Sequence, residues 1–341
     1  MSNSTTTNLL GNGGRVSLFG SRWVSLLALL LLAQLALILA VYWPRNADTT
    51  AGEPLLAAFD PAQVQGLTIT DGNEKTIHAV RQNGGWVLPD AGDYPVKEEK
   101  VTGLLEKFGG LTRNRLVATQ SATLTQLAVA DDSFARRVVL EMADGSQQTL
   151  YVGDGPRYRT SHVRLGGENN AYLSLDFAAD ETATRMTDWI DTSYLSIPEA
   201  SVQKMILENG NGVVDFYRDE QAQWQMGGLA EGEVFNSNNL TSMLTTLSSL
   251  NMAEPLGKEA KPGYGLDNPT ARVQLEYKDD AGDLKTAELL VGALDPSSSY
   301  YAAHSTESPY YVYIAKYSLD RFVERTRADF LQQPPTPTPV P

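Results

Sequence analysis

The chain has three histidines, the side chains that most readily ligate a metal ion. They are His78, His162 and His304, and each falls in a different strand-like stretch. No His-x-x-x-His or His-Glu-x-x-His spacing occurs, so no two of them share one face of a helix. The chain has no Cys, which excludes thiolate catalysis, disulfides and Cys-based zinc or iron–sulfur sites. We therefore expect no metal site and no cofactor.

Ser201 and Lys204 have the Ser-x-x-Lys spacing of penicillin-binding enzymes. That chemistry needs the start of a helix, where the hydroxyl and the amine share one face. Here the pair comes directly before a predicted strand at residues 204–207. No Gly-x-Ser-x-Gly motif occurs either, so no nucleophile elbow is indicated. The sequence therefore predicts no catalytic residues and no enzyme.

Glycine-rich and acidic stretches read as turns. Residues 153–156, Gly-Asp-Gly-Pro, lack the Gly frame and the Lys of a phosphate loop. The acidic pairs at 131–132 and 279–280 do not complete a calcium loop, which needs six to eight oxygen ligands. Asp and Asn favour turns through hydrogen bonds to their own backbone. We expect solvent-exposed turns at these places.

Tyrosines near the C-terminus form the candidate interaction surface. They are Tyr300, Tyr301, Tyr310, Tyr311 and Tyr313. Alternation along a strand places Tyr311 and Tyr313 on one face and Tyr310 on the other. Two interpretations stay open: tyrosine packs well in a half-wet sheet core, and an exposed tyrosine surface suits a protein or glycan partner.

Composition limits the partners of the 341-residue chain. It carries 41 acidic against 27 basic residues, a formal net charge of −14. Binding to nucleic acid needs clustered Lys and Arg, so we expect no nucleic-acid partner. Because 42% of the residues are hydrophobic, the bulk of the chain can bury a core.

Residues 23–43 are predicted to form a transmembrane helix. Only Ser25 and Gln34 interrupt the apolar run, and neither is charged. A helix of this length spans about 31 Å, close to the thickness of the hydrocarbon core. Trp23 at one end and Tyr42 with Trp43 at the other are typical of the two membrane interfaces. Lipid is therefore one expected partner of the chain.

A buried helix and a cleaved signal peptide are the two alternatives to the anchor. The run is longer than the apolar region of a signal peptide, and Ile38 stands where a small residue would be needed for cleavage after Ala40. Arg15 and Arg22 precede the span without any acid, which predicts a cytoplasmic N-terminus in the cell membrane and an extracytoplasmic bulk. Residues 1–22 are then a cytoplasmic tail, residues 44–54 a linker and residues 332–341 a Pro-rich tail.

Between the linker and the tail, one pattern occurs twice. Trp86 and Trp224 each end a second strand-like stretch, and a helix-like block with i, i+3, i+4 spacing follows. The apolar residues of the two blocks are Val101, Leu104, Leu105, Phe108 and Leu111, and Leu240, Met243, Leu244, Leu247 and Leu250. Residues 55–198 and 199–331 are therefore predicted to be two tandem domains.

Each copy is predicted to be α+β, a mostly antiparallel sheet with a helix packed on one face. The gaps between strands are short and turn-like at residues 71–73, 144–145, 209–212 and 280–282. Amphipathic stretches at residues 176–190 and 317–331 are predicted to form the last helix of each copy. The predicted fold class is thus an N-terminal transmembrane helix followed by two such copies.

Several motifs together resemble a known bacterial family. Phe-Asp-Pro lies at residues 59–61, Tyr-Pro-Val at 94–96 and Tyr-Gly-Leu-x-x-Pro at 264–269. With the single apolar segment and the lone Trp86, this set resembles domain-of-unknown-function family 4340 over residues 22–331.

The resemblance implies a single-span membrane protein with this domain in two copies. Many members are encoded beside ABC-type transporter components and a gliding-type auxiliary protein, so a transporter component is the implied protein partner. No activity is implied. The first copy departs from the family pattern, because residues 127–132 read Leu-Ala-Val-Ala-Asp-Asp where Tyr-Gly-Leu-x-x-Pro would fall.

We expect a membrane-anchored extracytoplasmic accessory protein that works by binding a partner and is associated with an ABC-type transport system. One alternative is a receptor for a small ligand or polymer of the cell envelope, with a pocket where the copies meet near Pro198. A second is an envelope hydrolase, which would need His162 to converge with Asp154 or Glu168.

Overall fold

The computed structural model describes residues 26, 29–34 and 52–332. The chain divides into residues 1–52 and residues 53–341. Trp23, Tyr42 and Trp43, most of the predicted span and nearly all of the predicted tails lie outside the described residues. Residues 29–34 are helical, and the described part of the chain contains no helix long and apolar enough to cross a bilayer.

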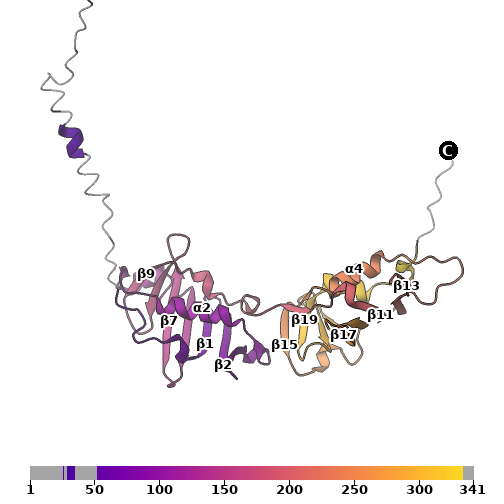
Figure 1. Cartoon of the computed structure of the whole chain (residues 1–341). Helices are drawn as coiled ribbons and strands as arrows, with labels where there is room; N and C mark the ends of the chain where they lie inside the picture. Colours follow the sequence, from indigo (N-terminus) through magenta and orange to yellow (C-terminus); the bar gives the residue numbers. More distant parts are fainter. Residues whose placement is uncertain (1–25, 27–28, 35–51, 333–341) are drawn as a thin grey trace, which may run out of the picture. The chain divides into compact units, whose positions relative to one another are not determined.

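The first sheet, called sheet 1, is antiparallel throughout, with the order β4-β3-β2-β1-β6-β7-β8-β9-β5 (Figure 1). Its strands are β1 (Val64–Asp71), β2 (Thr76–Gln82), β3 (Gly85–Leu88), β4 (Tyr94–Pro95), β5 (Leu116–Ala118), β6 (Arg136–Met142), β7 (Gln147–Asp154), β8 (Thr160–Leu165) and β9 (Ala171–Leu175). Its helical elements are η1 (Pro61–Gln63), η2 (Pro89–Ala91), α2 (Glu98–Gly109), α3 (Ser121–Gln126), η3 (Ala179–Thr182) and η4 (Met186–Asp188).

The second sheet, sheet 2, is also antiparallel, with the order β13-β12-β11-β16-β17-β18-β19-β15. Its strands are β11 (Val202–Asn209), β12 (Gly212–Arg218), β13 (Trp224–Met226), β15 (Glu254–Gly257), β16 (Ala271–Lys278), β17 (Leu284–Asp295), β18 (Tyr300–Ser305) and β19 (Tyr311–Ala315). Around it lie η5 (Glu199–Ser201), α4 (Asn238–Leu247), η6 (Pro262–Tyr264), α5 (Lys316–Val323) and η7 (Arg327–Phe330). A separate pair joins β10 (Ser193–Leu195) to β14 (Leu250–Asn251).

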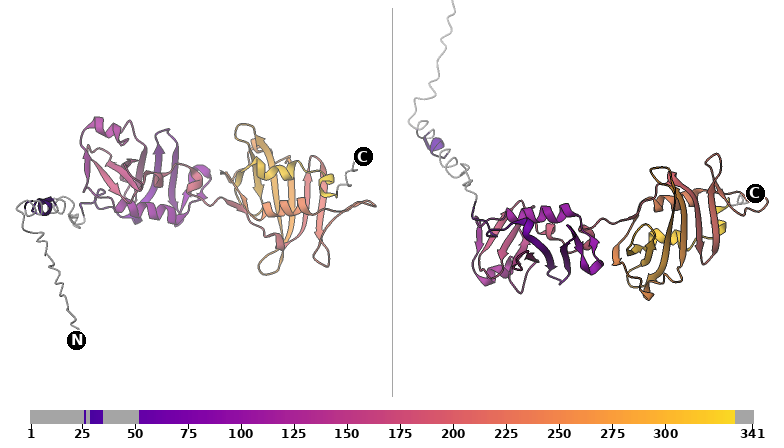
Figure 2. Two further views of the ribbon diagram at one scale, coloured as in Figure 1. Left: turned by 90° about the horizontal axis from the view of Figure 1, so that it is seen from above. Right: turned by 60° about the horizontal axis from the view of Figure 1, so that its bottom comes forward.

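The two sheets have corresponding strand orders. Sheet 2 repeats the order of sheet 1 strand for strand, except that β4 has no counterpart. The main helix of sheet 1, α2, follows β4, and that of sheet 2, α4, follows β13. The next strand of the same sheet, β5 or β15, forms its far edge. Figure 2 shows the two sheets, with β18 and β19 in the yellow end of the colour range.

Alternation of apolar residues explains why each sheet has one buried face. In sheet 1, Leu67 and Val138 face Leu104 and Phe108 of α2, and all four are buried. In sheet 2, the residues with the same role are Met205, Leu207, Val273, Leu275, Leu289 and Ile314, and Leu240, Met243, Leu244 and Leu247 of α4 pack with them. We call the helix-covered side of each sheet its inner face and the other side its outer face.

The lone tryptophans have the same structural role in both copies. The Arg81 guanidinium lies 5.9 Å from the ring centroid of Trp86, and that of Arg218 lies 4.6 Å from the ring centroid of Trp224. Arg81 also donates to the Ala62 carbonyl in η1, and Arg218 donates to the Val202 carbonyl at the start of β11 and to the Glu199 carbonyl in η5. The pair therefore joins the second and third strands to the start of the first.

The helix predicted within residues 176–190 is wrong. The segment forms only the 3-10 turns η3 and η4, whereas residues 317–331 form α5 and η7. Thr182 donates its hydroxyl to the Ala179 carbonyl, and the Trp189 indole donates to the Ala183 carbonyl. Side chain–backbone bonds of this kind compete with a helical ladder, which accounts for the difference.

Candidate functional site: the outer faces of the two sheets

A chain segment crosses the outer face of each sheet at a glycine. A Cβ on Gly153 of β7 would collide with the Leu127 carbonyl oxygen, and a Cβ on Gly292 of β17 would collide with the Tyr264 carbonyl oxygen. The crossing segments are residues 119–135 in sheet 1 and residues 258–270 in sheet 2. Both glycines therefore permit a close approach of two backbones.

The Tyr-Gly-Leu-x-x-Pro motif at residues 264–269 forms the crossing in sheet 2. Gly265 has a left-handed φ of 65°, and at the matching place in the first copy Ala128 has a φ of 53°. Both crossings thus have a residue of positive φ directly after the carbonyl that meets the glycine, although the two segments differ in sequence.

In sheet 1 the crossing segment closes the outer face with a small apolar cluster. The cluster consists of Ala118, Leu124, Val129, Ala130, Tyr151 and Ala171, with Leu127 and Phe134 packed against it. Arg164 of β8 lies beneath the segment with its side chain only 2% exposed. It donates to the carbonyls of Val129 and Glu168 and to the Asp131 carboxylate, and its guanidinium lies 4.4 Å from the Tyr151 ring centroid.

Arg164 pairs with Asp131 and also holds the segment by its backbone. The pKa of Asp131 is lowered, chiefly by the hydrogen bond from Arg164. Because a buried guanidinium needs its donors satisfied, these contacts fix the segment against the sheet. The outer face of sheet 1 is therefore closed where β7, β8 and β9 meet.

In sheet 2 the matching positions carry aromatic side chains. Arg164 pairs with Ala171 and His162 with Leu173 in sheet 1. In sheet 2 the same register pairs His304 with Tyr311 and Ala302 with Tyr313. The residues Tyr300, His304, Tyr311 and Tyr313, which we call the tyrosine face, are all partly exposed.

Ring stacking organises the tyrosine face. The ring centroids of His304 and Tyr311 are 4.4 Å apart, and those of Tyr300 and Tyr313 are 6.2 Å apart, with the rings close to parallel in both pairs. The ring of Tyr264 from the crossing segment lies tilted against that of Tyr311, with 5.7 Å between the ring centroids. The rings restrain one another, so they form an ordered apolar surface that needs little further ordering to bind a partner.

Burial lowers the pKa of His304, although the carboxylate of Glu288 acts in the opposite direction. The folded chain therefore holds a proton on this imidazole less readily than an unfolded chain does.

The other two predicted tyrosines have structural roles. Tyr301 faces the inner side, where it is buried and donates its hydroxyl to Asp320 of α5. Tyr310 is buried beside Tyr94, with 4.6 Å between ring centroids, and donates its hydroxyl to the Asp93 carbonyl. Burial raises the pKa of Tyr94 to about 12.

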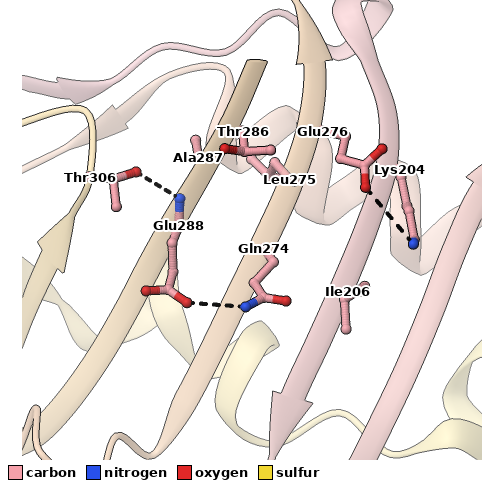
Figure 3. A pocket seen from close by; sticks show the side chains of 9 residues that line it. All are labelled: Lys204, Ile206, Gln274, Leu275, Glu276, Thr286, Ala287, Glu288 and Thr306. Carbon is pink, nitrogen blue, oxygen red and sulfur yellow. Dashed lines mark hydrogen bonds and ion pairs between the residues drawn. The ribbon is translucent and has the colours of Figure 1, made fainter. Parts of the chain in front are cut away.

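A shallow groove of about 370 Å³ lies on the outer face of sheet 2 beside the tyrosine face (Figure 3). Its lining includes Lys204 and Ile206 of β11, Gln274 and Glu276 of β16, Thr286 and Glu288 of β17, and Thr306. Glu288 accepts hydrogen bonds from Arg272 and Gln274. The Oε1 atom of Glu276 lies 3.9 Å from Nζ of Lys204. The groove thus combines an apolar floor with fixed polar groups.

Ser201, Lys204 and Glu168, residues of the catalytic alternatives, contact other groups. The Ser201 hydroxyl donates to the Pro198 carbonyl, and Lys204 faces Glu276 rather than that hydroxyl. Glu168 is engaged by both terminal nitrogens of Arg113, at 2.7 and 2.8 Å. In the described ranges no three His, Asp or Glu side chains gather in a way that could hold a metal ion.

The remaining candidates lie at turns or within strands. The acidic pairs at 131–132 and 279–280 lie in turns, and Asp279 accepts hydrogen bonds from the backbone of Ala281 and Asp283. His78 lies in β2 and His162 in β8.

Sequence reasoning missed the roles of Arg164 and His304 and the groove. Their partners lie on strands distant in the sequence, so only the register reveals them. The alternation of Tyr311 and Tyr313 around a buried Val312 was the one signal that pointed to this face.

A family model described as "Domain of unknown function (DUF4340)" matches residues 86–269 and residues 235–335. No curated protein matches the chain. No solved structure matches it either.

Proposed function

Because the chain belongs to the DUF4340 family, whose description assigns no activity, we propose a function from its surfaces. The protein is a membrane-anchored, extracytoplasmic accessory protein that binds a protein partner through the tyrosine face. The partner is a component of an ABC-type transport system, as the family resemblance implies.

One observation carries the binding role. At corresponding positions, sheet 1 buries Arg164 and Ala171, whereas sheet 2 leaves His304 and Tyr311 partly exposed. Because the same fold closes this face in sheet 1, the fold does not require the face to be exposed in sheet 2. Tyrosine is enriched at the centres of protein interfaces, where it supplies a large contact area at low entropic cost.

The anchoring role is supported by sequence. Residues 23–43 are long enough to span the hydrocarbon core, and Trp23, Tyr42 and Trp43 fit its two interfaces. The preceding Arg15 and Arg22 favour a cytoplasmic N-terminus. This orientation places both sheets outside the cytoplasm.

Two measurements test the proposal separately. Sodium carbonate extraction of membranes should leave the full chain in the pellet, and its release would contradict the anchor.

Affinity purification in mild detergent should recover a transporter component with the wild type. Tyr311→Ala/Tyr313→Ala should lower that recovery about tenfold or more, as for interface hot spots. The matched control, Leu173→Ala in sheet 1, should recover the component like the wild type. Equal recovery by the tyrosine variant would contradict the binding role.

The groove favours a second candidate function, binding of an envelope polymer such as a glycan. Stacked rings next to fixed amide, hydroxyl and carboxylate groups suit a sugar chain lying across β16–β19. Retention of the purified chain on an immobilised envelope glycan, lost in Gln274→Ala/Glu288→Ala, would favour this candidate. Unchanged retention of this double variant would exclude the groove as the glycan site.

A further inference from the structure

One edge of sheet 1 exposes a group of large apolar side chains. Leu116 and Val117 of the edge strand β5 are 53% and 42% exposed, Leu175 at the end of β9 is 48% exposed, and Tyr158 in the β7–β8 turn is 89% exposed. Single exposed leucines are common on soluble proteins. A group of them at one edge indicates a surface that contacts something.

Strand pairing brings these residues to the same edge. Thr160, which ends the turn of residues 155–159, pairs with Leu175. The backbone of Leu173, two residues earlier in β9, donates to the Arg115 carbonyl. The turn and the end of β9 are therefore neighbours, and β5 runs beside β9 with Leu116 opposite Tyr172.

Three arginines lie among the apolar residues. Arg115, Arg157 and Arg159 are exposed, and none of them forms an ion pair within the described part of the chain. By contrast, Arg113 and Arg164 of the same sheet are paired with carboxylates. Asp154 and Asp176 flank the turn and β9. In a chain of net charge −14, this cluster of unpaired cations indicates an anionic partner.

The length of the linker limits the distance of this edge from the bilayer. Glu53 accepts a hydrogen bond from the backbone of Arg113, and Pro54 bridges to Thr112, directly before β5. Residues 44–52 alone separate Glu53 from the end of the predicted span. An extended chain of this length reaches at most about 35 Å.

We propose that this edge docks on the anionic lipid headgroups of the membrane that anchors the chain. The basic edge consists of Arg115, Leu116, Val117, residues 157–159 and Leu175. The arginines bind lipid phosphates, Tyr158 lies at the interface, and the aliphatic side chains contact the acyl boundary. This proposal rests on the membrane anchor of the proposed function and is independent of the tyrosine face.

The absence of cysteine from the sequence allows a direct test. The full chain is prepared with Val117→Cys and labelled with an environment-sensitive fluorophore. It is reconstituted in vesicles of phosphatidylcholine with or without phosphatidylglycerol, containing headgroup spin-labelled lipid. Val213→Cys, on the exposed Val213 of β12, is the matched control. We expect strong quenching at residue 117 in anionic vesicles, several-fold weaker quenching in neutral ones, and none at residue 213.

Charge reversal sharpens the test. Arg115→Glu/Arg157→Glu/Arg159→Glu should reduce quenching at residue 117 to the level of the control, while the chain still floats with the vesicles. Quenching at residue 117 that, with the three arginines unchanged, is equal in neutral and anionic vesicles or absent from both overturns the proposal. Spin labels at residue 117 that couple between two chains would show instead that β5 pairs with a second copy, which also overturns it. Loss of flotation itself would contradict the anchor and is read independently of quenching.

Discussion

The two copies have the same strand order, but their outer faces differ. The first copy covers it with residues 119–135 and holds this cover with Arg164, whereas the second presents Tyr300, Tyr311 and Tyr313 around His304. The features common to both copies, the crossing glycines and the Arg–Trp pairs, are structural. The difference between the copies is therefore a better guide to function than their similarity.

The largest expected effect is a difference in the free energy of unfolding between variants of Arg164 and of His304. Arg164→Leu leaves the carbonyls of Val129 and Glu168 without their donor beneath the cover, so we expect the free energy of unfolding to fall by about 3 kcal/mol. His304→Leu removes a partly exposed ring, and its effect should stay within about 1 kcal/mol. Urea unfolding of the full chain in detergent measures both. Similar losses for the two variants would contradict the distinction between a closed and an open face.

The crossing glycines test what the copies share. Gly153→Ala and Gly292→Ala each place a Cβ against a backbone carbonyl, so both should lower the free energy of unfolding by about 2 kcal/mol. Gly103→Ala is the control, because nothing lies within 4 Å of its new Cβ in α2 and alanine favours a helix. Thermal unfolding compares the three. A loss at only one crossing would show that the motif has different roles in the two copies.

A smaller, pH-dependent difference is expected at His304. Its pKa in the folded chain lies below the ordinary 6.5, so the unfolded chain takes up the proton more readily. The free energy of unfolding should therefore fall as the pH drops below about 6.5, and this contribution is constant at higher pH. His304→Gln should flatten the slope between pH 7.5 and 5.5, measured by urea midpoints. A His304 NMR titration midpoint above 6.5 would reverse the expected sign.

Local patterns predicted most of the fold. The spacing at Val101–Phe108 and at Leu240–Leu247 predicted α2 and α4, and all four predicted turns connect paired strands. The segment at 176–190 has helical periodicity but forms 3-10 turns, because local bonds from the side chains of Thr182 and Trp189 to nearby carbonyls compete with the helical ladder.

The candidate site was only partly predictable. Alternation separates Tyr311 and Tyr313 from Val312, but no local signal reveals that Tyr301 and Tyr310 are buried. Their burial depends on α5 and on contacts with Asp93 and Tyr94, which are distant in the sequence. The pairing of Arg164 with residues 129–131 is likewise a tertiary fact.

Site-specific photo-crosslinking tests the central claim most directly. A benzophenone amino acid replaces Tyr313 on the open face or its counterpart Leu173 on the closed one, in the full chain within native membranes. We predict a crosslink to one protein from position 313, identified by mass spectrometry as a transporter component, and none from position 173. Equal crosslinks from both positions, or a crosslink from position 173 alone, would contradict the account.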